Sequence, residues 1–186
     1  MDNIIQIRDL TFAYAAGDEP VLSDINIDIS SGEFVIIMGS SGSGKTTLLK
    51  MLKRNMIPAG RYSGRVYIYG KEADKLTDRE NAAGIGYVSQ DPDNQIVTDK
   101  VWHELAFGLE NLGMDNVTIR KKVAEMSEYF GITGWYDKEV SKLSGGQKQI
   151  LNLASVMVMQ PGILLLDEPT ANLDPLAAIR FLDVQQ

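Results

Sequence analysis

Apolar and polar residues alternate along the first part of the chain. Ile5 and Ile7 flank one polar residue, and single polar residues separate the isoleucines of residues 25–29. This period of two is typical of strands with one buried face, so we expect a half-buried antiparallel sheet. Residues 34–38 are instead an unbroken apolar run, which predicts a strand covered on both faces.

Helical and strand patterns then follow one another. Apolar residues recur at helical spacing in four stretches, residues 45–53, 98–112, 118–130 and 144–159. Short strands are expected at residues 65–69, 85–89 and 163–166. A last helix is expected to begin at Asp174, which precedes Pro175. Strands interleaved with helices predict the α/β class, with a mostly parallel sheet flanked by helices, an N-terminal antiparallel β portion and a helical subdomain.

Composition narrows the class of protein. The 186 residues are 44% hydrophobic and 23% charged, as in ordinary globular domains, and the net charge is −7. The acidic balance argues against nucleic acid as a partner, which needs basic patches. Zero cysteines and one histidine exclude disulfides and thiolate or histidine-cluster metal sites. No apolar run approaches the roughly 18 residues of a membrane span and the start lacks a signal pattern, so we expect the cytoplasmic side.

A glycine- and serine-rich loop carries the clearest chemical pattern. Residues 39–46, the phosphate loop, fit the pattern Gly, four residues, Gly, Lys, then Ser or Thr. The backbone N–H groups of such a loop cup triphosphate oxygens, Lys45 meets the β and γ phosphates, and Thr46 offers its hydroxyl to Mg²⁺. The alternative is a flexible turn before a helix. The expected nucleotide-binding residues are Gly39, Ser40, Ser41, Gly42, Ser43, Gly44, Lys45, Thr46 and Thr47.

Two carboxylates follow the strand expected at residues 163–166. Asp167 and Glu168 stand at its carboxyl end, which is where open α/β sheets place their ligand sites. Asp167 is the expected Mg²⁺ contact, and Glu168 is the expected general base for an attacking water. The alternative is a strand that simply emerges into an acidic turn.

Residues 143–147, Leu-Ser-Gly-Gly-Gln, form a second phosphate-suited helix start. Ser144 and Gln147 have the spacing of a capping box, and Gly145 and Gly146 leave the helix N-terminus accessible to an anion. An ordinary cap is the alternative, although a cap does not need two glycines, which weaken a first turn. The segment resembles the signature sequence of the ATP-binding cassette (ABC) ATPases, whose fold is a P-loop NTPase core. The resemblance implies a dimer in which ATP lies between the phosphate loop of one subunit and the signature of a second ABC ATPase subunit.

Other residues match the same family. Tyr14 resembles the aromatic residue that stacks on adenine, and the alternative is packing on the core. Gln90 resembles the glutamine that contacts Mg²⁺ and the attacking water, and its alternative is a strand-ending amide. Asp174 resembles part of the loop that crosses the dimer interface, unless it is only a helix cap. The resemblance implies a single ABC ATPase domain over residues 1–186, with residues 1–90 and 160–186 as core and residues 91–159 as helical subdomain.

Residues 86–114 carry a finer resemblance, through residues 90–96 and 104–113, to the ATPases of energy-coupling factor importers, which serve vitamins and transition-metal ions. It implies an ATPase that uses ATP and Mg²⁺, lies peripherally on the cytoplasmic face of the membrane, and docks its integral membrane components near residues 90–113. The family often has acidic residues where Trp102 and His103 stand. Trp102 is either an exposed anchor or a packing residue, and His103 is expected to be a surface or packing residue.

One feature of the family is missing. Its switch histidine, which contacts the γ phosphate, follows a further strand beyond the helix at Asp174, and the chain stops at Gln186. We therefore expect a C-terminally truncated chain or part of a longer, possibly tandem, polypeptide, with weak hydrolysis.

Two alternative functions remain. One is a non-transport ABC ATPase of DNA maintenance or of ribosomes, although the 53 positions between Gln90 and Leu143 are too few for a long coiled-coil insertion. The other is a nucleotide-binding module with little turnover.

Overall fold

The computed structural model describes residues 3–17 and 19–170, and the chain divides into two compact units, Met1–Asn81 and Ala82–Gln186. The helix expected at Asp174 lies outside the described residues. No helix in the described part of the chain is long and apolar enough to cross a lipid bilayer.

The first unit is built on a four-stranded antiparallel sheet. Its strands, in the spatial order β2-β1-β3-β4, are β1 (Asn3–Tyr14), β2 (Leu22–Ser30), β3 (Gly60–Ile68) and β4 (Lys71–Glu72). Ile5 pairs with Ile29 and Ile7 with Ile27, which confirms the antiparallel pairing predicted from the alternating isoleucines. Ile5 and Ile7 are buried, whereas the isoleucines of β2 are half-buried.

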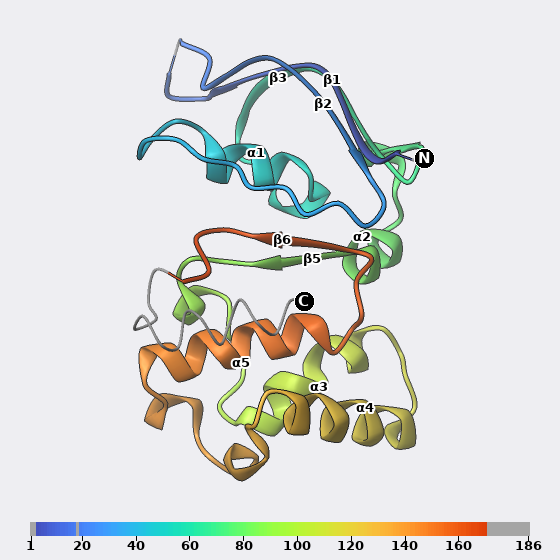
Figure 1. Cartoon of the computed structure of the whole chain (residues 1–186), viewed down its shortest axis with the longest axis vertical. Coiled ribbons are helices and arrows are strands. Elements are labelled where there is room, and N and C mark those ends of the chain that lie inside the picture. Colours follow the sequence, from blue (N-terminus) through green and yellow to red (C-terminus); the bar gives the residue numbers. More distant parts are fainter. Residues whose placement is uncertain (1–2, 18, 171–186) are drawn as a thin grey trace. The chain divides into compact units, whose positions relative to one another are not determined.

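The helical segments of this unit lie after the phosphate loop and on either side of the strand pair β3–β4 in the chain. Helix α1 (Lys45–Met51) lies against one face of the sheet (Figure 1) and buries Thr47, Leu48 and Met51. The short turns η1 (Arg54–Met56) and η2 (Ala73–Lys75) lie before and after the strand pair β3–β4, and α2 (Asp78–Gly84) begins at the end of the unit.

The prediction that residues 34–38 form a strand covered on both faces is wrong. These residues belong to no strand pairing of the described structure, and all five are exposed, Met38 by 84%. A strand exists only where a neighbouring backbone supplies ladder hydrogen bonds. An apolar run supplies hydrophobicity but no such partner, and none of the strands β1 to β4 pairs with these residues.

The second unit places helices against a two-stranded parallel sheet. Strands β5 (Ile85–Val88) and β6 (Ile163–Leu166) pair in parallel. Helix α5 (Gly145–Met157) packs between this sheet and the helices α3 (Val101–Asn111) and α4 (Asn116–Tyr129), as Figure 1 shows. Short turns complete the unit, namely η3 (Pro92–Asn94), η4 (Thr133–Trp135) and η5 (Val140–Lys142). The predicted α/β class is confirmed.

Local signals fix the helix ends of this unit. Asp115 accepts hydrogen bonds from the backbone N–H groups of Val117 and Thr118 and so caps α4, which begins two residues earlier than apolar spacing predicts because a cap does not depend on that spacing. Gly131 has φ 65° just beyond α4, as expected for a glycine stop. Between the helices lies a core that contains Leu105, Leu109, Val123, Leu151 and Ala154.

Candidate functional site: a phosphate loop and a strand-end carboxylate pair

The phosphate loop takes a backbone path that its glycines permit. Gly42 has φ 79° and Gly44 has φ 90°, a left-handed region that side chains with a Cβ rarely adopt. A Cβ at Gly44 would also lie 3.0 Å from the backbone oxygen of Val21. Gly44 is the N-terminal cap of α1, so the loop turns directly into the helix, as the motif predicts.

Lys45 folds its side chain back over the loop. Its Nζ donates to the backbone oxygens of Gly39 at 2.9 Å and Ser40 at 3.0 Å. The ammonium therefore lies at the loop itself, where it can exchange neutral carbonyl partners for anionic phosphate oxygens, which form stronger charge-assisted hydrogen bonds. Its role in nucleotide binding stays a prediction.

Tyr14 ends β1 beside the first turn of α1. Its hydroxyl and the Thr47 Oγ1 are 2.7 Å apart, and its ring meets Phe12 edge-on with centroids 5.0 Å apart. The side chain is still 39% exposed, so Tyr14 combines a packed edge with accessible surface near the helix that follows the phosphate loop. The structure brings Tyr14 and Thr47 together, and adenine stacking stays a prediction.

The parallel pairing of β5 and β6 brings two sequence-distant segments together. Val88 pairs with Leu166, and the backbone N–H of Asp167 donates to the oxygen of Val88 at 2.9 Å. The residues that follow each strand therefore meet at one edge. There the Gln90 Nε2 donates to the Glu168 Oε2 at 3.0 Å, so the predicted glutamine and the predicted general base are in direct contact.

Glu168 has an unusual backbone. Its φ of 48° lies in the left-handed region, which costs a residue with a Cβ about 1 kcal/mol or more unless the surroundings hold it. The side chain is exposed, so burial does not impose this conformation. Strain of this kind clusters at functional sites, and the residue that carries it here is the one that accepts the hydrogen bond from Gln90.

Asp167 is a buried carboxylate with a phenol partner. It is 6% exposed, and the Tyr87 hydroxyl donates to its Oδ2 at 2.8 Å. Burial, followed by the hydrogen bond to Asp167 and its charge, raises the pKa of Tyr87 well above the ordinary value of 10.0, so the phenol stays protonated and keeps donating even in alkaline solution. The sequence patterns assigned no site role to Tyr87, although it lies only three residues before Gln90.

The donor set at this strand edge fits Mg²⁺. It offers carboxylate and amide oxygens, from Asp167, Glu168 and Gln90, and these are the ligands that Mg²⁺ prefers. Within residues 3–17 and 19–170, no group of three or more His, Asp or Glu side chains forms a metal cage.

The signature segment forms the predicted capping box at the start of α5. Gln147 N–H donates to the Ser144 Oγ at 3.3 Å, and Ser144 N–H donates to the Gln147 Oε1 at 2.9 Å. A Cβ at Gly145 would meet nothing within 4 Å, so that glycine is not required by packing within the described chain. The capping box is confirmed, whereas contact with a nucleotide stays a prediction.

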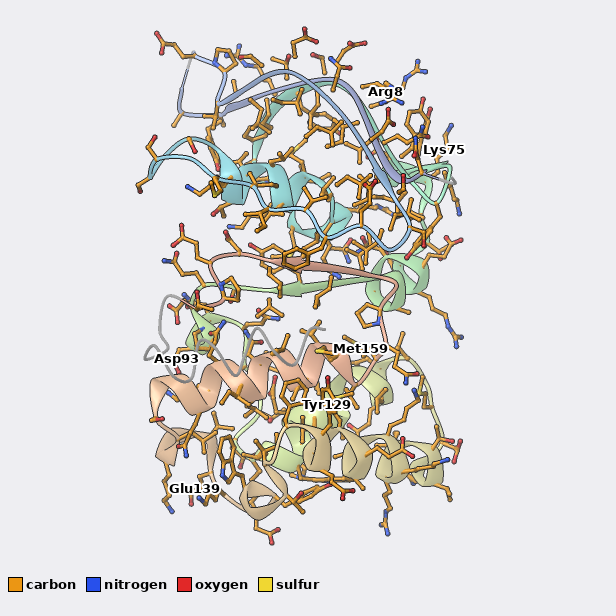
Figure 2. The ribbon with its side chains drawn as sticks, viewed as in Figure 1. Arg8, Lys75, Asp93, Tyr129, Glu139 and Met159 are labelled. Atoms are coloured by element: carbon orange, nitrogen blue, oxygen red, sulfur yellow. The ribbon has the colours of Figure 1, made fainter. Side chains whose placement is uncertain are left out.

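Lys148, in the first turns of α5, ties the signature segment to the loop after β5. Its Nζ forms an ion pair with Asp93. Figure 2 labels Asp93 beside the beginning of α5 and Met159 beyond the other end of that helix.

Two predicted surface or packing residues lie in α3. The half-buried Trp102 stacks obliquely on Tyr136, with ring centroids 5.6 Å apart, so it is a packing residue. The exposed His103 lies 3.6 Å from Asp99, as expected for a surface residue.

These features define an α/β protein with a phosphate loop, a strand-end carboxylate pair and a capped glycine helix start. The family model described as ABC transporter matches residues 22–171. The chain belongs to the ABC transporter family.

Curated relatives agree with this assignment. A putative ABC transporter ATP-binding protein of Bacillus cereus is 48% identical over 177 residues, which are 95% of this chain and 32% of the relative. The energy-coupling factor transporter ATP-binding protein EcfA1 of Lacticaseibacillus paracasei is 38% identical over 184 residues, 99% of this chain and 65% of the relative. The chain thus spans about a third of the length of the most similar of these relatives.

Solved structures share the fold. CbiO1 of Clostridium perfringens, described as part of the ABC transporter complex cbiONQ, has a TM-score of 0.85 and 35% identity, and the match covers 100% of this chain and 73% of CbiO1. The ATP-binding cassette MJ0796, a dimer in a post-hydrolysis state with ADP and phosphate, has a TM-score of 0.84 and 26% identity, with 97% and 81% coverage. The predicted resemblance to ABC ATPases, and to those of energy-coupling factor importers, is confirmed.

Proposed function

We propose that the protein is the ATP-hydrolysing subunit of a membrane importer of the energy-coupling factor type, with a vitamin or a metal ion as cargo. The observation that carries the hydrolytic part is the contact of Gln90 with Glu168 beside the buried Asp167. An exposed carboxylate held by an amide is suited to take a proton from a water molecule, and the amide is suited to orient that water.

In this proposal, different residues of the chain contact the phosphates, the adenine and the attacking water. The phosphate loop binds the β and γ phosphates through backbone N–H groups and Lys45, while the ring of Tyr14 offers a surface for adenine. Thr46, Gln90 and Asp167 would each offer an oxygen to Mg²⁺, which would neutralise phosphate charge when bound. Glu168 accepts a proton from the attacking water as the water oxygen bonds to the γ phosphorus. The bond from that phosphorus to the bridging oxygen breaks, so ADP leaves and the transferred group becomes inorganic phosphate.

A second ABC ATPase subunit completes the site in this proposal. Gly145 and Gly146 present backbone N–H groups at the start of α5 to the ATP of the partner. Ser144 and Gln147 form the capping box that holds this helix start and line the same nucleotide site with their side chains, and Asp174 contributes to the interface. The dimeric state of MJ0796 with ADP and phosphate supports such an arrangement. Closure of two cassettes on ATP and reopening after hydrolysis provide the mechanical step.

Membrane components dock near residues 90–113 in this proposal. Val97 and Phe107 expose apolar surface there, and the similarity to EcfA1 and to CbiO1 of the cbiONQ complex supports an importer. The protein then works as a peripheral subunit on the cytoplasmic face of the membrane. Those components, rather than this chain, select the cargo.

The test is phosphate release from ATP by the native protein, with and without Mg²⁺, followed by co-purification with membrane components. We expect Mg²⁺-dependent hydrolysis and a complex with integral membrane proteins. If the complex with membrane proteins binds ATP but does not hydrolyse it, the proposal is contradicted. The alternative function, a nucleotide-binding module with little turnover, is then favoured. Hydrolysis in a complex with nucleic acid or ribosomes would contradict the importer part alone.

A further inference from the structure

The end of β5 is held on its free edge by the side-chain amide of Gln95. The Gln95 Nε2 donates to the backbone oxygen of Tyr87 at 2.8 Å, and its Oε1 accepts from the backbone N–H of Ser89 at 2.9 Å. Alternate residues of a strand bond on opposite sides, and Val88 bonds toward β6. Gln95 therefore supplies, from a side chain, the two hydrogen bonds that a further strand would supply on the other side.

Helix α5 adds two more amides to the same point. The Asn152 Nδ2 donates to the Gln95 Oε1 at 3.2 Å, and the Gln149 Nε2 donates to the backbone oxygen of Ser89 at 3.2 Å. Gln149 and Asn152 are three residues apart, so they share one face of the helix. Both are fully buried. The helix that begins with the signature segment is thus bonded to the residue that immediately precedes Gln90.

Stability alone does not account for these amides. The Gln149 Oε1 and the Asn152 Oδ1 are buried and have no hydrogen-bond partner in the structure, and a buried unpaired acceptor is destabilising. Apolar side chains of similar shape would fill the same space without an unpaired acceptor, but would lose the hydrogen bonds that Gln149 donates to the half-buried Ser89 oxygen and Asn152 donates to Gln95. The amides form directional hydrogen bonds that connect α5 to Ser89, directly and through Gln95. Apolar groups cannot form such bonds.

We propose that Gln149 and Asn152, together with Gln95, are positioning residues that set the contact of Gln90 with Glu168 according to the position of the signature helix. The connection runs from α5 to Ser89, along one peptide bond to Gln90, and from its amide to the carboxylate. When α5 moves, Ser89 moves with it. The inference rests on the proposed function, because it concerns the group proposed to activate water.

Gln149→Met and Asn152→Leu in the native protein test the proposal, because each removes the amide and also its unpaired oxygen. We expect both variants to keep the thermal unfolding midpoint and the KM for ATP, and to lower kcat about tenfold, as expected for a misplaced rather than a missing group. Asn116→Ala, at an exposed asparagine in α4, is the matched control and should leave kcat unchanged.

Two further measurements separate positioning from general structural damage. In a Gln90→Ala background, Gln149→Met should lower kcat no further, because its effect passes through Gln90. Hydrogen exchange of the Ser89 amide should be faster in Gln95→Met than in the wild type, since that amide loses its acceptor.

The outcomes are distinguishable. A lowered unfolding midpoint with unchanged kcat, or a loss in the Gln90→Ala background equal to that in the wild type, would overturn the inference and leave the proposed function intact. Absence of hydrolysis by the wild-type native protein would overturn the proposed function, and the inference with it.

Discussion

The side-chain amide of Gln90 donates to a carboxylate oxygen of Glu168 across the ends of two parallel strands, 78 residues apart in the chain, at 3.0 Å. The pairing of Val88 with Leu166 fixes this contact, because it places the residues that follow each strand at the same edge. Glu168, which accepts this hydrogen bond, has a backbone φ of 48° in the left-handed region.

Replacing the proposed base tests that contact chemically. Glu168→Gln keeps the shape of the side chain and removes its basicity, so we expect unchanged ATP affinity and a loss of turnover of about 10²–10⁴-fold. Fluorescent-nucleotide titration and phosphate release measure the two effects. Glu128→Gln, an exposed glutamate of α4, is the control. Turnover close to that of the wild type would remove Glu168 from its assigned role.

Lys45 is expected to act in binding. Lys45→Ala removes an ammonium that is hydrogen-bonded to the backbone oxygens of the phosphate loop. A charge-assisted hydrogen bond contributes about 1.5–3 kcal/mol, so ATP affinity should fall roughly 10- to 100-fold. Isothermal titration with ATP measures it, and Lys50→Ala in the same helix is the matched control. Equal affinities of Lys45→Ala and the wild type would show that phosphate binding lies elsewhere.

Tyr87→Phe tests the support of the buried Asp167. The variant leaves a buried carboxylate without its phenol donor, which should cost about 1–3 kcal/mol of unfolding free energy, measured by urea denaturation. Because the pKa of Tyr87 is raised from its ordinary 10.0, the wild-type advantage should be complete below pH 10 and fall only as the phenol ionises at higher pH. Tyr129→Phe, at an exposed tyrosine, should have no such effect.

Ser144 allows capping to be separated from nucleotide contact. Ser144→Ala should lose about 1 kcal/mol of stability, since the cap of α5 disappears. Ser144→Asp retains a capping oxygen and hence stability, but it adds a negative charge where the partner's phosphates are proposed to bind. We therefore expect Ser144→Asp to abolish ATP-dependent dimerisation in light scattering while its unfolding midpoint stays near that of the wild type. Dimerisation by this variant would contradict the signature role.

Glu80 should give the first unit an acid-range pH dependence. Lys71, followed by the N–H and hydroxyl of Thr77, lowers the pKa of Glu80 to about 2. A lowered folded pKa means that its stabilisation is complete above the ordinary value of 4.5 and is lost as pH falls toward 2. Carboxyl chemical shifts over this range measure it, and Glu80→Gln should flatten the stability profile. A midpoint near 4.5 would show that these bonds do not persist in solution.

Local patterns predicted much of the fold. The alternating isoleucines predicted the β1–β2 pairing, and β6 spans the predicted residues 163–166. Helices α1, α3, α4 and α5 were predicted, whereas the short helix α2 was not. The helix ends were predicted less well, because caps such as Asp115 depend on a side-chain hydrogen bond rather than on apolar spacing. The apolar run at residues 34–38 shows the opposite case, in which hydrophobicity predicted a strand that has no pairing partner among the described strands.

The sequence by itself determined the groups available for chemistry: the glycines that permit the phosphate loop, the lysine that follows it, the two carboxylates after an apolar strand and the capping box of α5. These are local patterns, and a backbone preference or a cap acts within a few residues. Only the tertiary structure decided that Gln90 contacts Glu168, that Tyr87 supports Asp167, and that Gln95 joins β5 to Asn152. Each of those contacts requires strand pairing or helix packing between residues far apart in the chain, and no local pattern specifies the register that brings them within hydrogen-bond distance.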